Sequence, residues 1–256
     1  MDPAEAFGVG RGDIVAVVGA GGKKSTLYAL TAGIGGAVLT ATVHIPPFEG
    51  HVGHLVVAER PSEAVETVDE GDWPLGLVPD RDGDRGRYLG YDPATVDALA
   101  SATDAPLLVK ADGARRRRSK APADDEPQVP ASSTVVVPVV SVRVVGEPLS
   151  EERVHRSERV AAIADLSAGE EIGVDDVVAV LTHESGGLKR VPEGAAVRPL
   201  VNMVDDDGLE ATARRVAEGL LGHRRVDRVV LGRMDLRKVV DVVECGSELL
   251  DVGPEV

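Results

Sequence analysis

Cysteine and aromatic residues are nearly absent from this chain of 256 residues. Cys245 is its one cysteine, which excludes an internal disulfide, a zinc site built from several cysteines and an iron–sulfur cluster within one chain. Aromatic residues make up 2% of the chain, so platforms on which nucleic-acid bases could stack are scarce. These absences favour chemistry carried by glycine, lysine and carboxylate groups.

Long apolar runs are also lacking. No stretch holds eighteen consecutive apolar residues, the length that a membrane-spanning helix needs. Residues 1–13 do not combine a basic segment with a following apolar stretch, the pattern of a secretory signal. We therefore expect a cytoplasmic protein with no membrane partner.

Positive charge, and lysine above all, is in short supply. The chain has 43 Asp and Glu against 28 Lys and Arg, a net charge of −15, which repels nucleic-acid phosphates and predicts no nucleic-acid partner. Only 6 of the basic residues are lysines. An acid excess with few lysines is typical of a halophilic protein that must stay soluble in a very salty cytoplasm. The candidate site described below contains four of the six lysines, namely Lys23, Lys24, Lys110 and Lys120.

Short apolar runs alternate with helix-length segments along the whole chain. We expect strands over residues 13–18, 37–42, 55–58, 106–111, 134–140, 197–204, 226–231 and 239–243. We expect helices over residues 25–31, 62–68, 95–102, 151–164, 174–182 and 209–221. This alternation predicts an α/β fold, a mostly parallel sheet with helices on both faces. The chain reads as one domain over residues 1–256, with a small helical insertion over residues 151–190.

The first predicted strand runs directly into a glycine-rich loop, GAGGKKST, and then into a helix. This context suits a phosphate-binding loop, because glycines let backbone N–H groups turn toward one anion and a helix N-terminus favours negative charge. A P-loop NTPase-like domain is therefore expected. The candidate nucleotide-binding residues are Gly19, Gly21, Gly22, Lys23, Lys24, Ser25 and Thr26.

The loop matches the common pattern G-x-x-x-x-G-K-[ST] only in part. If Lys24 is the phosphate lysine, Lys23 stands in place of the last glycine; if it is Lys23, the loop is shorter and Lys24 replaces the hydroxyl residue. A glycine-rich turn of a Rossmann-like domain is the structural alternative. The dinucleotide pattern G-x-G-x-x-G is not met, since Lys24 follows Gly19-x-Gly21 at the third glycine position.

A second segment, residues 106–130, begins with a hydrophobic strand and ends in a charged loop. Asp112 follows the strand directly, and a carboxylate there is a typical ligand of magnesium in phosphate-binding proteins. Five cations come within the next residues, Arg115, Arg116, Arg117, Arg118 and Lys120. They can bind an anionic ligand, and a solvated charged loop is the alternative. We predict Lys23 and Asp112 as catalytic residues, and Ser25 and Asp112 as metal ligands.

These motifs together make the chain resemble the YqeC family. The resemblance rests on GAGGKKSTLYAL, on Thr40, Thr42, His44 and Ile45, on ADGARRRRSKAPADDEPQVP, on VHRSE and on LVNMVDD. Members of that family are known as selenium-dependent hydroxylase accessory proteins or selenium-cofactor biosynthesis proteins, and they look like P-loop nucleotide-binding proteins. The resemblance implies a part in the maturation of molybdenum hydroxylases that need a labile selenium.

The family pattern also implies which residues hold the substrate. The substrate-binding candidates are His44, Arg115, Lys120, Glu126, His155 and Arg156. The chain departs from the pattern at Lys24, where Thr or Ser is expected, at Lys110, where an acid often stands, and at Asp125, where His is usual.

Three further patterns each have two interpretations. His44, His51 and His54 form either a metal cluster or scattered loop histidines. Residues 202–205 resemble the N-K-x-D guanine reader of GTPases, and an acidic turn is the alternative. Cys245 is either a selenium-carrying nucleophile or a packing residue.

Two functions of different class follow. The first is an enzyme, a magnesium-dependent NTPase or phosphotransferase that uses ATP or GTP in cofactor maturation. The second is a non-hydrolysing chaperone that positions a molybdopterin-type anionic cofactor. The expected partners are a nucleotide, with Mg²⁺, and a molybdopterin-type cofactor or a molybdenum hydroxylase.

The net charge of −15 predicts a salt-dependent fold. At 0.01 M salt the screening length grows to roughly 30 Å, so like charges repel across the whole molecule. We expect cooperative unfolding to be lost on dialysis to low salt, as followed by thermal melts in a series of potassium chloride concentrations. A melting temperature unchanged from low to molar salt would refute the halophilic interpretation.

Overall fold

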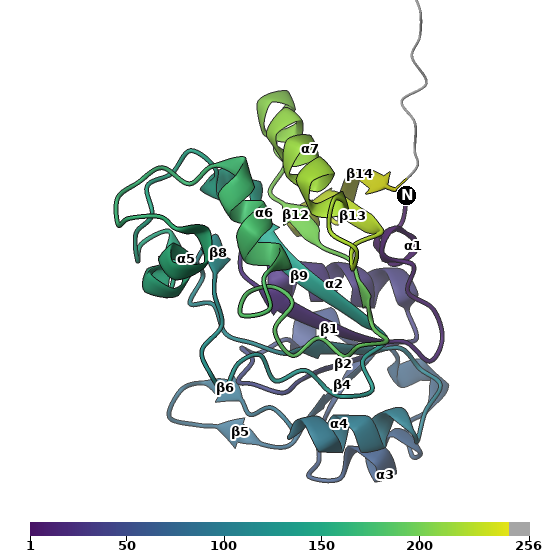
Figure 1. The fold of residues 1–256 in the computed structure, drawn as a ribbon. Coiled ribbons are helices and arrows are strands. Elements are labelled where there is room, and N and C mark those ends of the chain that lie inside the picture. Colours follow the sequence, from purple (N-terminus) through teal and green to yellow (C-terminus); the bar gives the residue numbers. More distant parts are fainter. Residues whose placement is uncertain (246–256) are drawn as a thin grey trace, which may run out of the picture.

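The computed structural model describes residues 1–245, and a ten-stranded sheet forms its centre (Figure 1). From edge to edge the sheet consists of β14 (Lys238–Glu244), β13 (Arg228–Arg233), β12 (Leu200–Asn202), β9 (Val135–Ser141), β1 (Ile14–Gly19), β7 (Leu107–Lys110), β2 (Val38–Ala41), β4 (Leu75–Val78) and β3 (His54–Val57), with β11 (Ala196–Val197) paired to β9. Neighbouring strands are parallel except for the antiparallel pair β13 and β14. The expected α/β class with a mostly parallel sheet is confirmed.

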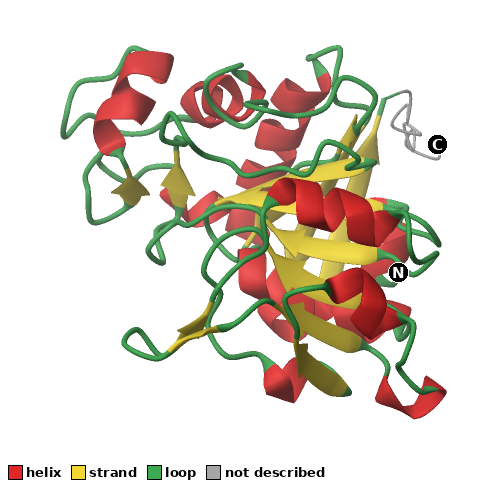
Figure 2. Cartoon of the chain, turned by 90° about the horizontal axis from the view of Figure 1, so that it is seen from below, coloured by secondary structure: helices red, strands yellow, loops and turns green. Residues whose placement is uncertain are grey.

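Helices cover both faces of this sheet (Figure 2). The helices are α1 (Pro3–Phe7), α2 (Lys23–Ile34), α3 (Pro61–Val65), α4 (Pro93–Ala100), α5 (Ser157–Ala164), α6 (Val174–Thr182) and α7 (Asp207–Leu221). Side chains alternate along a strand, so Val15 and Val17 of β1 pack with α1 and α2, while Ile14 packs with α3 and α4 on the other face. Helices α6 and α7 cover that second face toward β13.

Short elements complete the chain. They are the hairpin β5 (Arg81–Asp82) and β6 (Arg87–Tyr88), the parallel pair β8 (Ser119–Lys120) and β10 (Val154–His155), and the 3₁₀ turns η1 (Glu49–His51), η2 (Glu70–Asp72), η3 (Val142–Val144) and η4 (Met234–Leu236). None of the helices within residues 1–245 is both long enough and apolar enough to cross a membrane.

Three sequence-based expectations need correction. The helix expected over residues 151–164 begins only at Ser157, because Arg156 adopts a left-handed conformation directly after β10. The strand expected over residues 197–204 is divided into β11 and β12 around Pro199, which has no N–H to donate. The segment over residues 112–133 is not loop throughout, since it contains β8.

The order of the strands creates a crevice at the carboxyl ends of β1, β7 and β9. From β1 the chain passes through α2 to β2 on one side, whereas from β9 it passes to β12 on the other side. In open α/β sheets ligands bind where neighbouring strands connect in opposite directions. The glycine loop follows β1 and Asp112 follows β7, so both lie at this edge.

Candidate functional site

The glycine loop is built so closely that side chains are excluded from it. Gly21 and Gly22 have φ values of 89° and 135°, which side chains rarely adopt. A Cβ on Gly21 would lie 2.4 Å from the backbone nitrogen of Ser141, and one on Gly22 would lie 2.0 Å from Nδ2 of Asn202. The loop therefore packs its backbone directly against the ends of β9 and β12.

The backbone N–H groups of the loop are free to bind an anion. Helix α2 has Gly22 as its N-cap without a side-chain cap, and the N–H of Thr26 is the first to bond back, to the Gly22 carbonyl at 3.0 Å. Within the described residues, the N–H groups of residues 21–25 donate no hydrogen bond. Five consecutive unpaired donors at a helix start are the arrangement that phosphate groups occupy in proteins.

Asp112 connects this loop to the neighbouring strand. It is 1% exposed, and its Oδ2 accepts the Gly19 N–H at 2.9 Å. Two ammonium groups flank the carboxylate, Lys23 at 2.8 Å from Oδ1 and Lys120 at 2.9 Å from Oδ2. Burial acts to raise the pKa of Asp112, but the charges of Lys23 and Lys120 outweigh it and hold the pKa below its usual value. The carboxylate is therefore ionised across the neutral pH range.

Lys23 folds back onto the loop from which it comes. Its ammonium donates to the Gly19 carbonyl and pairs with Asp112. Burial lowers the pKa of Lys23, against the pull of the Asp112 charge. Lys24, the next residue, is partly exposed and makes no ion pair within residues 1–245. The two lysines that the sequence could not distinguish are thus separated by the fold, because only Lys23 enters the buried cluster.

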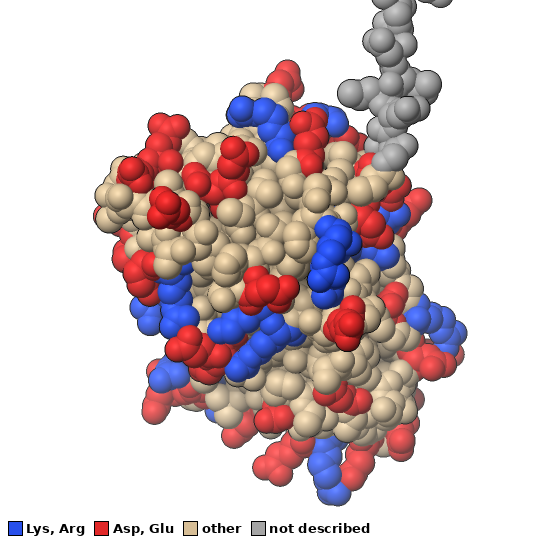
Figure 3. Space-filling model, viewed as in Figure 1, with Lys and Arg blue, Asp and Glu red and all other residues tan. Residues whose placement is uncertain are grey.

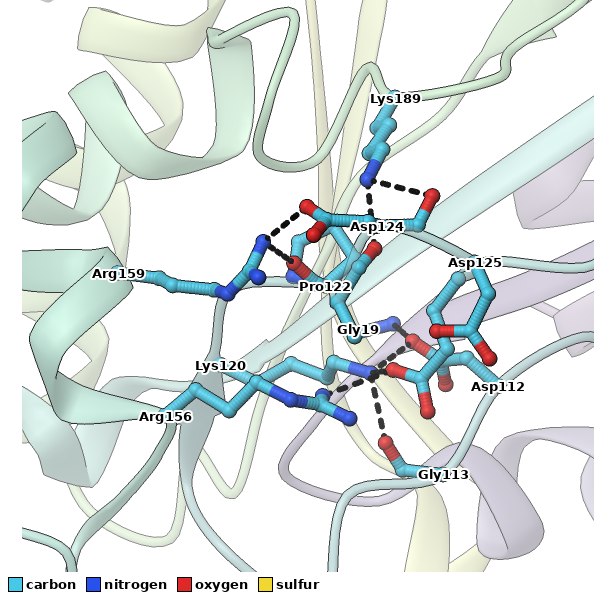
Figure 4. Close-up of polar contacts among 12 residues, drawn as sticks. Gly19, Asp112, Gly113, Lys120, Pro122, Asp124, Asp125, Arg156, Arg159 and Lys189 are labelled. Atoms are coloured by element: carbon cyan, nitrogen blue, oxygen red, sulfur yellow. Dashed lines mark hydrogen bonds and ion pairs between the residues drawn. The ribbon is translucent and has the colours of Figure 1, made fainter.

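Lys120 and Arg156 extend the cluster away from the loop (Figure 4). The Lys120 ammonium donates to the Gly113 carbonyl and to Glu126 Oε2, both at 2.7 Å, and pairs with Asp112. Arg156 reaches the same Glu126 oxygen at 2.8 Å. These contacts use all three donors of the Lys120 ammonium. Its predicted contribution to substrate binding is therefore charge alone.

Lys110 is a further lysine of the site, which the sequence placed in the candidate segment and marked as a departure from the family pattern without giving it a role. Its ammonium donates to the carbonyls of His44 at 2.8 Å and Asp112 at 2.9 Å. Burial, reinforced by the charge of Lys23, lowers the pKa of Lys110 to about 7. A lysine in place of an acid next to A-D-G was the signal that could have identified it.

The remaining predicted residues lie around the cluster and do not form ion pairs with Asp112. The His44 carbonyl accepts from the Lys110 ammonium, while the His44 ring lies 3.1 Å from the Asp82 carboxylate. The Thr26 hydroxyl donates a hydrogen bond to the Gly22 carbonyl at 3.1 Å and so stabilises the loop. Arg115 is exposed, with a left-handed backbone. His155 is buried next to Lys120, its partner in the β8–β10 pair.

The charged loop is held in place at several points. Arg118 pairs with Glu147 at 2.5 Å. Arg159 pairs with Asp124 at 2.8 Å (Figure 4). Lys189 donates to the Ala123 carbonyl at 2.6 Å. The alternative of a freely solvated charge run therefore fails for residues 118–126, although it describes the exposed Arg115 and Arg116.

The guanine-reader interpretation of residues 202–205 does not fit the contacts. Asn202 donates to the Gly21 carbonyl at 2.8 Å and accepts the Met234 N–H at 3.0 Å, so its amide holds the loop in place. Asp205 pairs with Arg143 and Arg233.

The histidine metal cluster is not formed either. No group of three or more His, Cys, Asp or Glu that could hold a metal ion occurs in residues 1–245. The ring of His51 stacks on Tyr28, with centroids 3.6 Å apart, while the ring of His44 pairs with Asp82.

Comparison with known proteins places the chain in a family. The model of the YqeC protein family matches residues 15–158. Over 190 residues the chain is 30% identical to YqeC of Escherichia coli (strain K12), a match that covers 72% of this chain and 73% of the relative. No solved structure matches the chain. The chain therefore belongs to the YqeC family, and the resemblance stated from the motifs is confirmed.

The tight fit at Gly22 predicts a cost for any side chain there. Gly22→Ala places a Cβ at a left-handed φ and against Asn202, and we expect the free energy of unfolding to fall by about 1–3 kcal/mol. Gly36→Ala is the control, since its Cβ would meet nothing within 4 Å. Urea unfolding measures both, and equal stabilities of the two variants would contradict the packing described here.

The shifted pKa of Lys110 predicts that stability rises above neutral pH. The ammonium is lost at about 7 in the fold but near 10.5 in the unfolded chain, so between these values the unfolded chain binds more protons. From pH 7 to pH 9 the wild type should gain more free energy of unfolding than Lys110→Met. Urea titrations at both pH values measure this, with Lys238→Met, at the exposed first residue of the edge strand β14, as control. Equal gains in all three proteins would rule out the shift.

Proposed function

We propose that the chain binds a nucleoside triphosphate through the glycine loop, as a P-loop-like protein that uses ATP or GTP. The observation that carries this proposal is the row of five unpaired N–H groups at residues 21–25, next to the Lys23 ammonium. Such a row can donate hydrogen bonds to several phosphate oxygens, and a lysine neutralises the charge of those oxygens. The neighbouring Lys24 and Lys110 add positive charge in a chain whose net charge is −15.

Asp112 and Ser25 would hold the Mg²⁺ ion of such a nucleotide. Asp112 Oδ1 is buried, and its partner within residues 1–245 is the Lys23 ammonium at 2.8 Å. The Ser25 hydroxyl has no partner in the same part of the chain. Carboxylate and hydroxyl oxygens are ligands that magnesium prefers. Bound there, the ion would neutralise charge on the phosphates. Lys23 and Asp112 are the catalytic residues of this proposal.

The biological setting comes from the family. Because YqeC proteins are associated with selenium-dependent hydroxylases, we place this nucleotide-binding activity in the maturation of a selenium- and molybdenum-dependent hydroxylase. A molybdenum hydroxylase or its molybdopterin-type cofactor would then be the second partner.

One observation favours a second candidate, a non-hydrolysing chaperone for an anionic cofactor. The two carboxylates of the cluster, Asp112 and Glu126, are both paired with lysines, and Glu126 also with Arg156. A carboxylate neutralised in this way is a poor base for activating water. This candidate shares the anion site and differs only in turnover.

Calorimetric titration of ATP and GTP with magnesium, in molar potassium chloride, tests the proposal. Lys23→Ala should weaken binding at least tenfold, because a charge-assisted bond to phosphate contributes about 1.5–3 kcal/mol. Lys238→Ala, which removes an exposed lysine from the sheet edge, is the matched control and should bind as the wild type does. Release of inorganic phosphate then separates the enzyme from the chaperone. Unchanged affinity in Lys23→Ala would exclude the glycine loop as the nucleotide site.

A further inference from the structure

The strand pair β8–β10 places a histidine beside the lysine cluster. His155 is directly opposite Lys120 in the register of this pair. Residues opposite each other in a sheet project to the same side, and Lys120 projects toward Asp112 and Glu126. His155 is 8% exposed, and within the described chain its ring makes no hydrogen bond. Neither ring nitrogen of His155 is among the fully buried unpaired atoms of residues 1–245, so solvent, and therefore a ligand, can reach the unpaired imidazole.

Two arginines flank this imidazole. Arg156 contacts Glu126 through one nitrogen, at 2.8 Å, and its other nitrogens have no partner in residues 1–245. Arg115 is exposed and makes no ion pair in the same part of the chain. Burial lowers the pKa of His155, and the charges of Arg156, Lys120 and Arg115 lower it further, against the opposing charge of Glu126.

The charges of this group do not balance. The cluster holds four cations, Lys23, Lys120, Arg156 and Arg115, against the two carboxylates of Asp112 and Glu126. A further carboxylate whose charge acts on His155, that of Glu151, is exposed and accepts from the N–H and hydroxyl of Ser157. The excess of two positive charges matches a dianion better than a monoanion. Because the donors of Lys120 are used, the free donors belong to the two arginines and the histidine.

We propose that His155, Arg156 and Arg115 form a second oxyanion site, which binds the phosphomonoester group of a small-molecule second substrate. This inference rests on the proposed function for its place in a reaction, since the nucleotide phosphates would lie on the other side of Asp112. The ion pairs of Asp112 with Lys23 and Lys120 would lie between the two sites.

Calorimetric titration with inorganic phosphate, in the absence of nucleotide, tests the second site. The wild type should bind phosphate at two sites, one of which Lys23→Ala removes. Arg156→Gln and His155→Phe should each weaken the other site by about tenfold or more and leave the first unchanged. Arg159→Gln is the matched control, because Arg159 lies three residues after Arg156, in α5, and pairs with Asp124 outside the cluster. Acetate, a monoanion, should bind the second site more weakly than phosphate.

The outcomes separate this inference from the proposed function. A single phosphate site that Lys23→Ala removes, or wild-type binding by both Arg156→Gln and His155→Phe, overturns the second site. If ATP and GTP fail to bind while the Arg156-dependent phosphate site persists, the proposed function fails and the second site stands. Arg156→Lys keeps the charge and should retain most of the affinity.

Discussion

The buried carboxylate of Asp112 is the group on which the arrangement of the site depends. It fixes the end of β1 through the Gly19 N–H, and it compensates the charges of Lys23 and Lys120, both of which are buried. An uncompensated buried charge costs about 3–5 kcal/mol, so Lys23, whose ion pair within residues 1–245 is with Asp112, would not stay in place without it, while Lys120 would keep Glu126 alone. One side chain, that of Asp112 just after β7, therefore fixes the unpaired N–H groups of residues 21–25 and the cationic cluster relative to each other.

The distribution of charge concentrates lysines at this cluster in a chain with an excess of acids. Acidic side chains are spread over the surface, as Figure 3 shows for one face of the molecule, whereas four of the six lysines belong to the candidate site. Surface acids are screened by salt, but the lysines at Asp112 are buried and are screened far less. A very salty solvent thus weakens the general repulsion of anions and leaves the local attraction at the site in place.

Local patterns in the sequence predicted the parts of this site that depend on neighbouring residues. The β1–loop–α2 unit and Asp112 at the end of β7 follow from apolar runs that stop at glycine or at an acid. Asn202 was misinterpreted because its contact with the Gly21 carbonyl joins residues 181 positions apart, and no local pattern reports such a contact. The pair β8–β10 was missed because two-residue strands carry no periodicity. β4 was missed as well, since its four residues, LGLV, include a glycine.

The position of Lys23 links the stability of the loop to the binding of its ligand. In the structure its ammonium bonds to the Gly19 carbonyl and to Asp112, and these contacts stabilise the loop when no anion is bound. An ammonium has three donors, so Lys23 can add one bond to a phosphate without losing either contact. A second bond to the ligand would require it to leave Gly19 or Asp112. Leaving Asp112 would free Oδ1, the oxygen that a magnesium ion needs. Phosphate binding by Lys23 and metal binding by Asp112 would in that case support each other, because both are favoured by the same movement of one side chain.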